Sequence, residues 1–448
     1  MSATITATLP SLSAGSVEEE APPPGRTRSL VWGALLASLL PIGIEVGLPF
    51  QLSPADVLMP LLVPFALRGQ RAPITKFLVG VVAWSVIVVL LWSLYDSSPA
   101  VPPLQTLVFF WKPWVALLVA YRLVREARDL HRGAHRVLTL LAWAQAGLIG
   151  LITAGFLVTG DVTREGLTDS GLGVTGYTAG IWELPIGLYG FGQVNVTAGL
   201  LAVGVPLIVA HAMARTGTFR RVFWLSLIPV SWWFVITSGS RTSFITSLIF
   251  VVLLFLNRRR AAKELSVGKV VLSIVLITVA MTQADRLLEA SPKYRETITS
   301  VTQGNSSSVA SGRDELGDLV IADVRRSPLF GSGYGDFHRF HSDDGSPWVD
   351  SSPHNTYLAP FLKGGIPVGI AYLVLLLRSL PFNRLSLVRG TEWLSLPYTL
   401  ALTVGLFPFI DALTTPVLAG TILTTCGMLM ACQQAARQSG DEGDVVLN

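Results

Sequence analysis

The sequence predicts an all-α protein that crosses a membrane about twelve times. Hydrophobic residues make up 51% of its 448 residues and charged residues only 14%, which is far fewer charges than a soluble domain carries. Apolar runs recur along the chain, and each is close to the roughly 20 residues that a helix needs to cross a bilayer. A long, mostly polar stretch at 286–355 predicts a large outer loop late in the chain.

Twelve apolar runs are the predicted spans. They cover residues 29–47, 53–69, 75–94, 104–121, 137–158, 193–212, 222–238, 241–257, 268–285, 356–377, 393–410 and 413–432. Residues 1–28 are rich in Ser, Thr, Ala and Pro and predict a disordered cytoplasmic tail, and the polar residues 433–448 predict a second one. The membrane domain is therefore expected over 29–432, with a second long outer loop near 159–192.

The distribution of Lys and Arg predicts the orientation. If both termini lie in the cytoplasm, every short inner loop carries basic residues, as the retention of positive charge on the inner side requires. The two cysteines, Cys426 and Cys432, lie in the last apolar run without a nearby His. They are interpreted as small core residues, and neither a disulfide nor a metal site is expected.

The segment Thr-Ser-Gly-Ser-Arg-Thr-Ser at 237–243 joins two apolar runs and predicts a phosphate site. Helix N-termini attract anions, and a guanidinium can bind a phosphate through two hydrogen bonds. Ser240, Arg241 and Thr242 are therefore candidate phosphate ligands at the outer boundary of the membrane. The alternative is a tight turn whose Arg241 reaches the lipid headgroups.

The large outer loop carries further candidate residues, the first of them in a predicted helix. In residues 311–329, Leu316, Leu319, Val320 and Val324 have helical spacing, which predicts an amphipathic helix on the outer membrane surface with Arg313 near its start. Ser311 is expected to cap this helix and Pro328 to end it.

His354 and Asn355 directly precede the tenth predicted span. A neutral imidazole can accept a proton from a sugar hydroxyl near neutral pH, which makes His354 a candidate base. Within the span, Gly365 and Gly369 predict close approach of another helix.

Weaker candidates come from chemistry alone. Lys112 lies between Trp111 and Trp114 and can reach a phosphate or only the membrane surface, Asn195 can line a cavity, and Tyr334 can stack on a sugar ring. The pair Asp343 and Asp344 has no His or Cys partner at a suitable spacing, so no metal and no cofactor is expected.

Three blocks, “SGSRTS”, “SGRDELGDLVIADVRRSPLFGSGYGDF” and “SPHNTYLAPFLKGGIPVG”, resemble those of the O-antigen ligase and polymerase superfamily in order and spacing. The pattern His-[Asn/Ser/Gln]-x9-Gly of that family is matched by His354, Asn355 and Gly365. The block “GLYGFGQVNVTAG” also resembles the family, and the resemblance covers most of residues 30–432.

The resemblance implies a glycosyltransferase of the membrane GT-C type in the bacterial inner membrane. Such an enzyme takes a glycan from undecaprenyl pyrophosphate at the outer face and passes it to a hydroxyl of a lipid or glycan acceptor, without a divalent metal. Arg241 and Arg313 would hold the pyrophosphate, and His354 would act on the acceptor. Membrane lipids are further expected partners, and nucleic acid is not.

Two alternatives remain open. A polymerase of the same superfamily uses the same chemistry, with a second lipid-linked repeat as acceptor. A membrane transporter belongs to another class, but transporters usually show internal repeats and charged groups in mid-membrane. The chain shows no repeat, and its ionisable candidates gather at the outer boundary.

Overall fold

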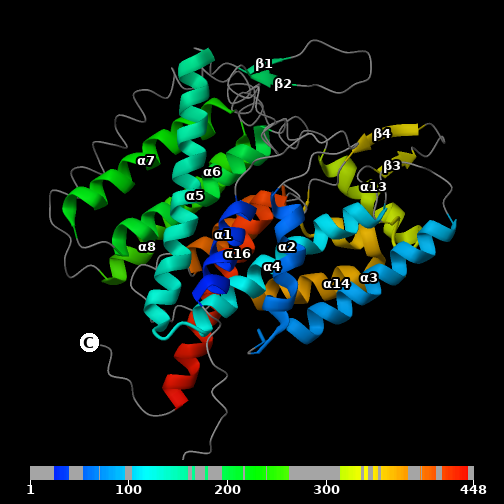
Figure 1. Cartoon of the computed structure of the whole chain (residues 1–448). Coiled ribbons are helices and arrows are strands. Elements are labelled where there is room, and N and C mark those ends of the chain that lie inside the picture. Colours follow the sequence, from blue (N-terminus) through cyan, green and yellow to red (C-terminus); the bar gives the residue numbers. More distant parts are fainter. Residues whose placement is uncertain are drawn as a thin grey trace, which may run out of the picture.

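The structure is a computed structural model of the whole chain. It describes residues 25–39, 54–69, 71–95, 103–159, 164–166, 177–179, 194–214, 217–238, 240–261, 313–333, 338–341, 347–351, 355–381, 394, 396–409 and 416–441. This part of the chain forms a bundle of helices with two short hairpins near one end (Figure 1).

The helices follow the predicted apolar runs. They are α1 (Gly25–Leu39), α2 (Pro54–Leu67), α3 (Thr75–Tyr95), α4 (Pro103–Arg125), α5 (Leu130–Thr159), α6 (Val194–Ala214), α7 (Thr218–Thr237), α8 (Arg241–Ala261), α13 (Arg313–Arg326), α14 (Ala359–Ser379), α15 (Leu396–Leu400), the π-helix η3 (Ala401–Leu406) and α16 (Pro416–Asp441). All predicted spans except 268–285, which lies outside the described residues, overlap one of these helices.

Six of the described helices are long and apolar enough to cross a membrane. They contain residues 75–92, 130–154, 196–214, 218–236, 359–379 and 417–438. Shorter apolar segments at 29–39, 57–67, 242–253 and 396–406 also coincide with predicted spans. A helical, polytopic membrane protein is therefore confirmed, whereas twelve spans and the GT-C architecture stay predictions.

The two hairpins add short strands where the sequence predicted loops. Strand β1 (Arg164–Gly166) pairs antiparallel with β2 (Tyr177–Ala179), and β3 (His338–His341) pairs antiparallel with β4 (Pro347–Ser351). Both lie in the predicted outer loops, at 159–192 and 286–355. The prediction of an all-α fold thus holds for the apolar runs and needs this correction outside them.

The core is centred on α4 and α16. Gly427 makes their contact possible, because a Cβ at this position would overlap the backbone of Leu117. Cys426 and Cys432 are buried in this core and unpaired, as predicted.

Helix α16 continues to Asp441, beyond the predicted boundary at 432. The Tyr121 hydroxyl donates a hydrogen bond to Oε1 of Gln434, and Arg125 donates one of 3.0 Å to Oε1 of Gln438. Residues 433–441 are therefore helical because α4 holds them, and the predicted disorder of this segment is corrected. Similarly, α1 begins at Gly25, inside the predicted tail 1–28.

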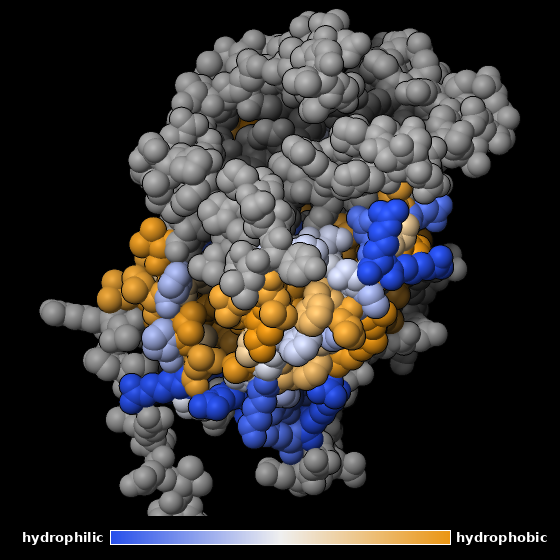
Figure 2. Space-filling view, turned by 90° about the vertical axis from the view of Figure 1, so that its right-hand side faces the viewer, coloured by the Kyte–Doolittle hydropathy of each residue, from blue (hydrophilic) through white to orange (hydrophobic). Residues whose placement is uncertain are grey.

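Basic side chains mark one end of the bundle. Figure 1 shows the start of α3, the end of α4 and the start of α5 at its lower end, and α13 and the hairpins towards its upper end. Lys76, Arg122, Arg125, Arg132 and Arg136 belong to the lower end. Figure 2 shows a hydrophobic belt with hydrophilic residues along its lower edge and a second hydrophilic patch at its upper right. The predicted orientation, with this basic end in the cytoplasm, stays a prediction.

Candidate active site

The turn between α7 and α8 buries a group of small hydroxyl side chains. Ser238, Ser240, Thr242 and Ser243 are each at most 4% exposed. The Ser238 hydroxyl accepts a hydrogen bond of 3.2 Å from the backbone N–H of Ser240, and the hydroxyl oxygens of Ser240 and Ser243 lie 2.9 Å apart. The predicted turn therefore exists, and its hydroxyls face the protein interior.

Helix α8 begins directly after this turn. The carbonyl oxygen of Ser240 accepts the helical hydrogen bond of Phe244 N–H at 3.1 Å, and Arg241 is the first residue of the helix. The N–H groups of a first helical turn have no partner within the helix, and the helix dipole adds partial positive charge there. An anion would be stabilised at this position. The side chain of Arg241 itself lies outside the described residues.

The π-helix η3 contacts α8 one turn after Arg241. A Cβ on Gly405 would lie 2.9 Å from the Cα of Thr246, so only a glycine lets the two backbones come this close. Thr246 is about 7.5 Å along α8 from Arg241, at a rise of 1.5 Å per residue. Single π-helical turns occur frequently at functional sites, because they shift side chains out of the regular helical order.

The turn that precedes α14 is hydrogen-bonded to this π-helix and to the residue that follows it. The backbone N–H of Thr356 donates to the carbonyl oxygen of Phe407 at 2.9 Å, and the Tyr357 hydroxyl donates to that of Thr403 at 2.7 Å. Tyr357 also meets the Phe407 ring edge to face, with centroids 6.0 Å apart. The start of α14 is thus linked through η3 to the first turns of α8.

Asn355 shapes that turn. Its Oδ1 accepts hydrogen bonds from the backbone N–H groups of Tyr357 at 2.9 Å and Leu358 at 3.2 Å. This is the capping role that short polar side chains play before a helix. The carbonyl half of the side chain therefore has a structural task, and only the amide half can bind a substrate.

The predicted amphipathic helix exists as α13, and its apolar side packs on the start of α14. Val320, 1% exposed, contacts Leu362, and Leu319, Val324 and Leu358 surround this pair. The helix begins at Arg313 and ends before Pro328, as expected. Ser311, the expected cap, lies outside the described residues, as does the Arg313 side chain.

The loop after α13 inserts into a break in α14. Gly365 has φ +73° and ψ −173°, which interrupts the helix. The freed Ile366 N–H donates to the carbonyl oxygen of Pro328 at 2.7 Å, and Ser332 N–H donates to that of Leu362 at 2.6 Å. Gly365 therefore serves a loop rather than the helix contact that its spacing predicted. Gly369 makes room for the Phe361 ring of its own helix.

The structure links three of the predicted site segments. The helices that carry Arg241 and Arg313 and the turn of Asn355 are joined through η3 and α14. Asn195 lies at the start of α6, with its side chain outside the described residues, and His354 and Tyr334 lie outside them entirely.

Lys112 lies apart from the turn of Asn355. It is buried on α4, where its neighbours Trp111 and Trp114 contact the ring of Tyr372. Tyr372 lies beyond the break at Gly365, roughly 9 Å further along α14 than Ile366 at 1.5 Å per residue. The structure therefore places the aromatic neighbours of Lys112 deeper in the bundle than the mouth of α14.

Lys363 is a residue that the sequence analysis missed. It lies on the first turns of α14, beside the break at Gly365, and is only 5% exposed. An ionisable side chain buried inside a membrane span is a functional candidate because burying its charge is costly. Its position within a predicted span was the signal that could have identified it.

Among the residues that the structure describes, no group of three or more His, Cys, Asp or Glu side chains has metal-binding geometry. The chemistry of the described site is instead that of hydroxyl groups, a helix N-terminus and a buried cation.

Residues 222–373 match the family model of O-antigen ligase. The matched region contains α8, α13 and most of α7 and α14, and with them Arg241, Arg313 and His354. A search of curated proteins found no match to the chain. The predicted resemblance to O-antigen ligases is thereby confirmed over this region, and it supports a ligase- or polymerase-type function in the assembly of envelope glycans.

Proposed function

We propose that this O-antigen ligase-like protein is an envelope glycan ligase, which transfers a polysaccharide from undecaprenyl pyrophosphate to an acceptor hydroxyl at the outer face of the inner membrane. The observation that carries the proposal is the link between the hydroxyl-lined start of α8, where Arg241 lies, and the turn of Asn355, next to His354. Both segments fall inside the O-antigen ligase match.

The reaction is a displacement at the anomeric carbon of the donor glycan. The acceptor oxygen forms a bond to this carbon while the bond from the carbon to the pyrophosphate oxygen breaks. The electron pair of the broken bond leaves with the lipid pyrophosphate, and the proton of the acceptor hydroxyl passes to the His354 imidazole. Attack from the side opposite the leaving group inverts the anomeric configuration.

The leaving pyrophosphate gains negative charge as the bond breaks. Fixed donors at that position stabilise the transition state more than the ground state. In the proposal these donors are Arg241, Arg313 and the first-turn N–H groups of α8, with the Ser240 and Thr242 hydroxyls beside them. Such a set can neutralise the leaving group in the absence of a divalent metal.

The proposal is tested by Arg241→Ala, Arg313→Ala and His354→Ala in purified protein with a defined lipid-linked donor and a panel of acceptors. Each loss is expected to lower the transfer rate by roughly 10²–10³, the usual cost of one transition-state donor. Arg220→Ala, an exposed cation at the start of α7, is the matched control. Unchanged transfer in all three site variants would contradict the proposal.

The second candidate is a polymerase of the same family, which the match also fits. The products of cells that carry His354→Ala distinguish the two. A ligase defect leaves long lipid-linked chains unattached, whereas a polymerase defect leaves single lipid-linked repeats.

A transporter is the candidate from another class. Transport of a lipid-linked glycan would deliver donor across vesicle membranes without forming a new glycosidic bond. Product analysis by mass spectrometry in detergent, where no compartments exist, decides the matter because only a transferase yields product there.

A further inference from the structure

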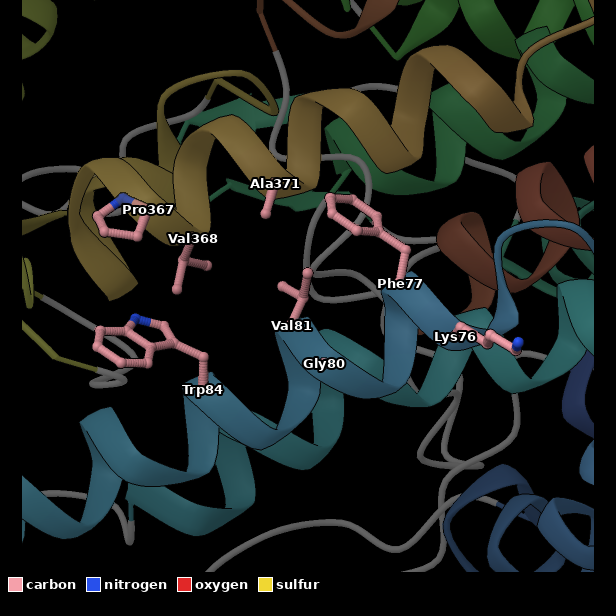
Figure 3. Close-up of a pocket in the computed structure, with 8 residues that line it drawn as sticks. All are labelled: Lys76, Phe77, Gly80, Val81, Trp84, Pro367, Val368 and Ala371. Atoms are coloured by element: carbon pink, nitrogen blue, oxygen red, sulfur yellow. The ribbon is translucent and has the colours of Figure 1, made fainter.

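Two cavities meet at Lys76 on the first turns of α3. One has a volume of about 250 Å³ and runs between α3 and α14, and the other, of about 370 Å³, lies at the start of α3. The first is lined by Lys76, Phe77, Gly80, Val81, Trp84, Pro367, Val368 and Ala371, as Figure 3 shows. The second is lined by Leu67, Arg71, Thr75, Lys76 and Val79.

The cavity between α3 and α14 is an apolar groove. In Figure 3 the side chains of Val81, Trp84 and Val368 point into the space between the two helices. Phe77 and Trp84 are 36% and 37% exposed, so the groove opens to the outside of the bundle. Helix α3 itself is a peripheral span, with only 33% of its apolar window buried. The groove therefore faces the hydrocarbon of the bilayer.

The adjoining cavity also has apolar walls, at Leu67 and Val79, but it carries polar groups on one side. Thr75 is 2% exposed, and its hydroxyl makes no hydrogen bond within the part of the chain that the structure describes. Arg71 and Lys76 lie beside it, and no carboxylate lines the cavity. The dipole of a helix of 21 residues adds positive potential at this point. A hydroxyl without a partner, two cations and a helix N-terminus match the oxygens of a phosphate group.

A third cation stands near the junction. The Arg378 guanidinium carbon lies 6.0 Å from the centre of the Phe77 ring, which lines the groove. Lys76 and Trp84 are separated by roughly 12 Å along α3, at 1.5 Å per residue. The cations at the start of α3 and the apolar groove therefore form one continuous site, which is long enough to hold part of an acyl chain.

We propose that the two cavities together bind one anionic phospholipid of the leaflet at the basic end of the bundle. Its phosphate group lies on Thr75, Lys76 and Arg71, and one acyl chain lies in the groove between α3 and α14. A phospholipid fits both cavities because it joins a phosphate to a hydrocarbon chain, whereas the polyprenyl pyrophosphate donor is proposed to bind at the start of α8. This site shares α14 with the proposed active site, but it uses Pro367, Val368 and Ala371 beyond the break at Gly365, and it is independent of the proposed transfer reaction.

The test measures bound lipid in the purified full-length protein by native mass spectrometry after partial delipidation. Phosphatidylglycerol and phosphatidylcholine with identical acyl chains are added in turn. The wild type is expected to retain phosphatidylglycerol preferentially. Loss of one basic residue, in Lys76→Gln or Arg71→Gln, is expected to weaken retention roughly fivefold, the usual contribution of one cation near an anionic surface.

A second variant blocks the groove without touching the cations. A Cβ on Gly80 meets no atom within 4 Å, so the backbone tolerates a side chain here, and Gly80→Leu is expected to fill part of the groove that Gly80 lines. It is expected to lower retention of both lipids. The matched controls are Arg220→Gln, another exposed cation, and Gly147→Leu on α5, where a Cβ also meets no atom within 4 Å.

Three outcomes overturn the proposal. One is equal retention of the two lipids together with wild-type retention in Lys76→Gln and Gly80→Leu. Another is displacement by inorganic phosphate as effective as by phosphatidylglycerol, which would indicate a site for a free anion. The third is a change in the oligomeric mass of Gly80→Leu with unchanged bound lipid, which would indicate contact with a second copy of the chain.

Discussion

Gly331 and Gly365 meet backbone against backbone where the loop after α13 enters α14. Both have positive φ angles, +64° and +73°. A Cβ on Gly331 would lie 2.6 Å from the backbone nitrogen of Gly365, and a Cβ on Gly365 would lie 2.6 Å from the carbonyl carbon of Leu329. This contact fixes the position of α13, and hence of Arg313, relative to the turn that precedes α14.

Gly365→Ala is therefore expected to destabilise the protein and to reduce glycan transfer. The added methyl group both strains a backbone with positive φ and overlaps the loop, at a cost of roughly 1–3 kcal/mol for the strain alone. Thermal unfolding in detergent measures the change. Gly317→Ala is the control, since a Cβ there meets no atom within 4 Å and alanine favours the interior of α13. A wild-type unfolding temperature in Gly365→Ala would refute the constraint.

Two substitutions of Asn355 separate its capping role from a substrate contact. Asn355→Asp keeps the Oδ acceptor for the N–H groups of Tyr357 and Leu358, whereas Asn355→Ala removes it. The alanine variant is expected to lose about 1 kcal/mol of stability. The aspartate variant is expected to keep its unfolding temperature and lose transfer at least roughly tenfold, because it lacks the amide donor. If the aspartate variant retains full transfer activity, Asn355 only caps the turn and makes no contact with the substrate.

Ser240→Ala and Thr242→Val are expected to weaken donor binding. Each removes a hydroxyl at the start of α8, and a hydrogen bond to a charged group contributes roughly 1.5–3 kcal/mol. The KM for the lipid-linked donor is expected to rise about tenfold or more, with a modest fall in the unfolding temperature because both side chains are buried and Ser240 is hydrogen-bonded to Ser243. Ser226→Ala is the control, because Ser226 is exposed on α7 and bonds the carbonyl oxygen of Phe223. If the KM for the donor rises equally in Ser226→Ala, the Ser240 and Thr242 hydroxyls do not bind the donor.

Lys363→Met tests the buried cation of α14. Methionine approximately preserves the length of the side chain but removes its charge, so a stability measurement beside the transfer assay separates a structural role of the cation from a functional one. Transfer is expected to fall at least roughly tenfold, since buried charges in spans are retained for function. Lys363→Arg keeps the charge and is expected to retain more activity. If Lys363→Met is fully active, the lysine has only a structural role.

Much of the molecule could be predicted from local pattern. The apolar runs predicted helices at the correct places because helical backbone bonding is the way to satisfy polar groups in lipid. The turn at 237–243 and the helix α13 follow from small polar residues and from helical spacing, both of which act within a few residues. The boundaries at 25 and 441 were missed, because contacts such as Tyr121 with Gln434 depend on a distant helix.

The site was predicted as an order of residues, namely Arg241, Arg313 and His354, and its region is matched by the O-antigen ligase model. The sequence alone determined the membrane class, the helical segments and the chemical character of the candidates, because hydrophobicity and residue type are local properties. Only the tertiary structure decided that α8 packs closely against η3 at Gly405 and that η3 is hydrogen-bonded to the turn of Asn355. It also decided that the loop after α13 enters α14 at Gly365. These contacts join residues far apart in the chain, and they depend on close backbone approach, which no spacing pattern encodes.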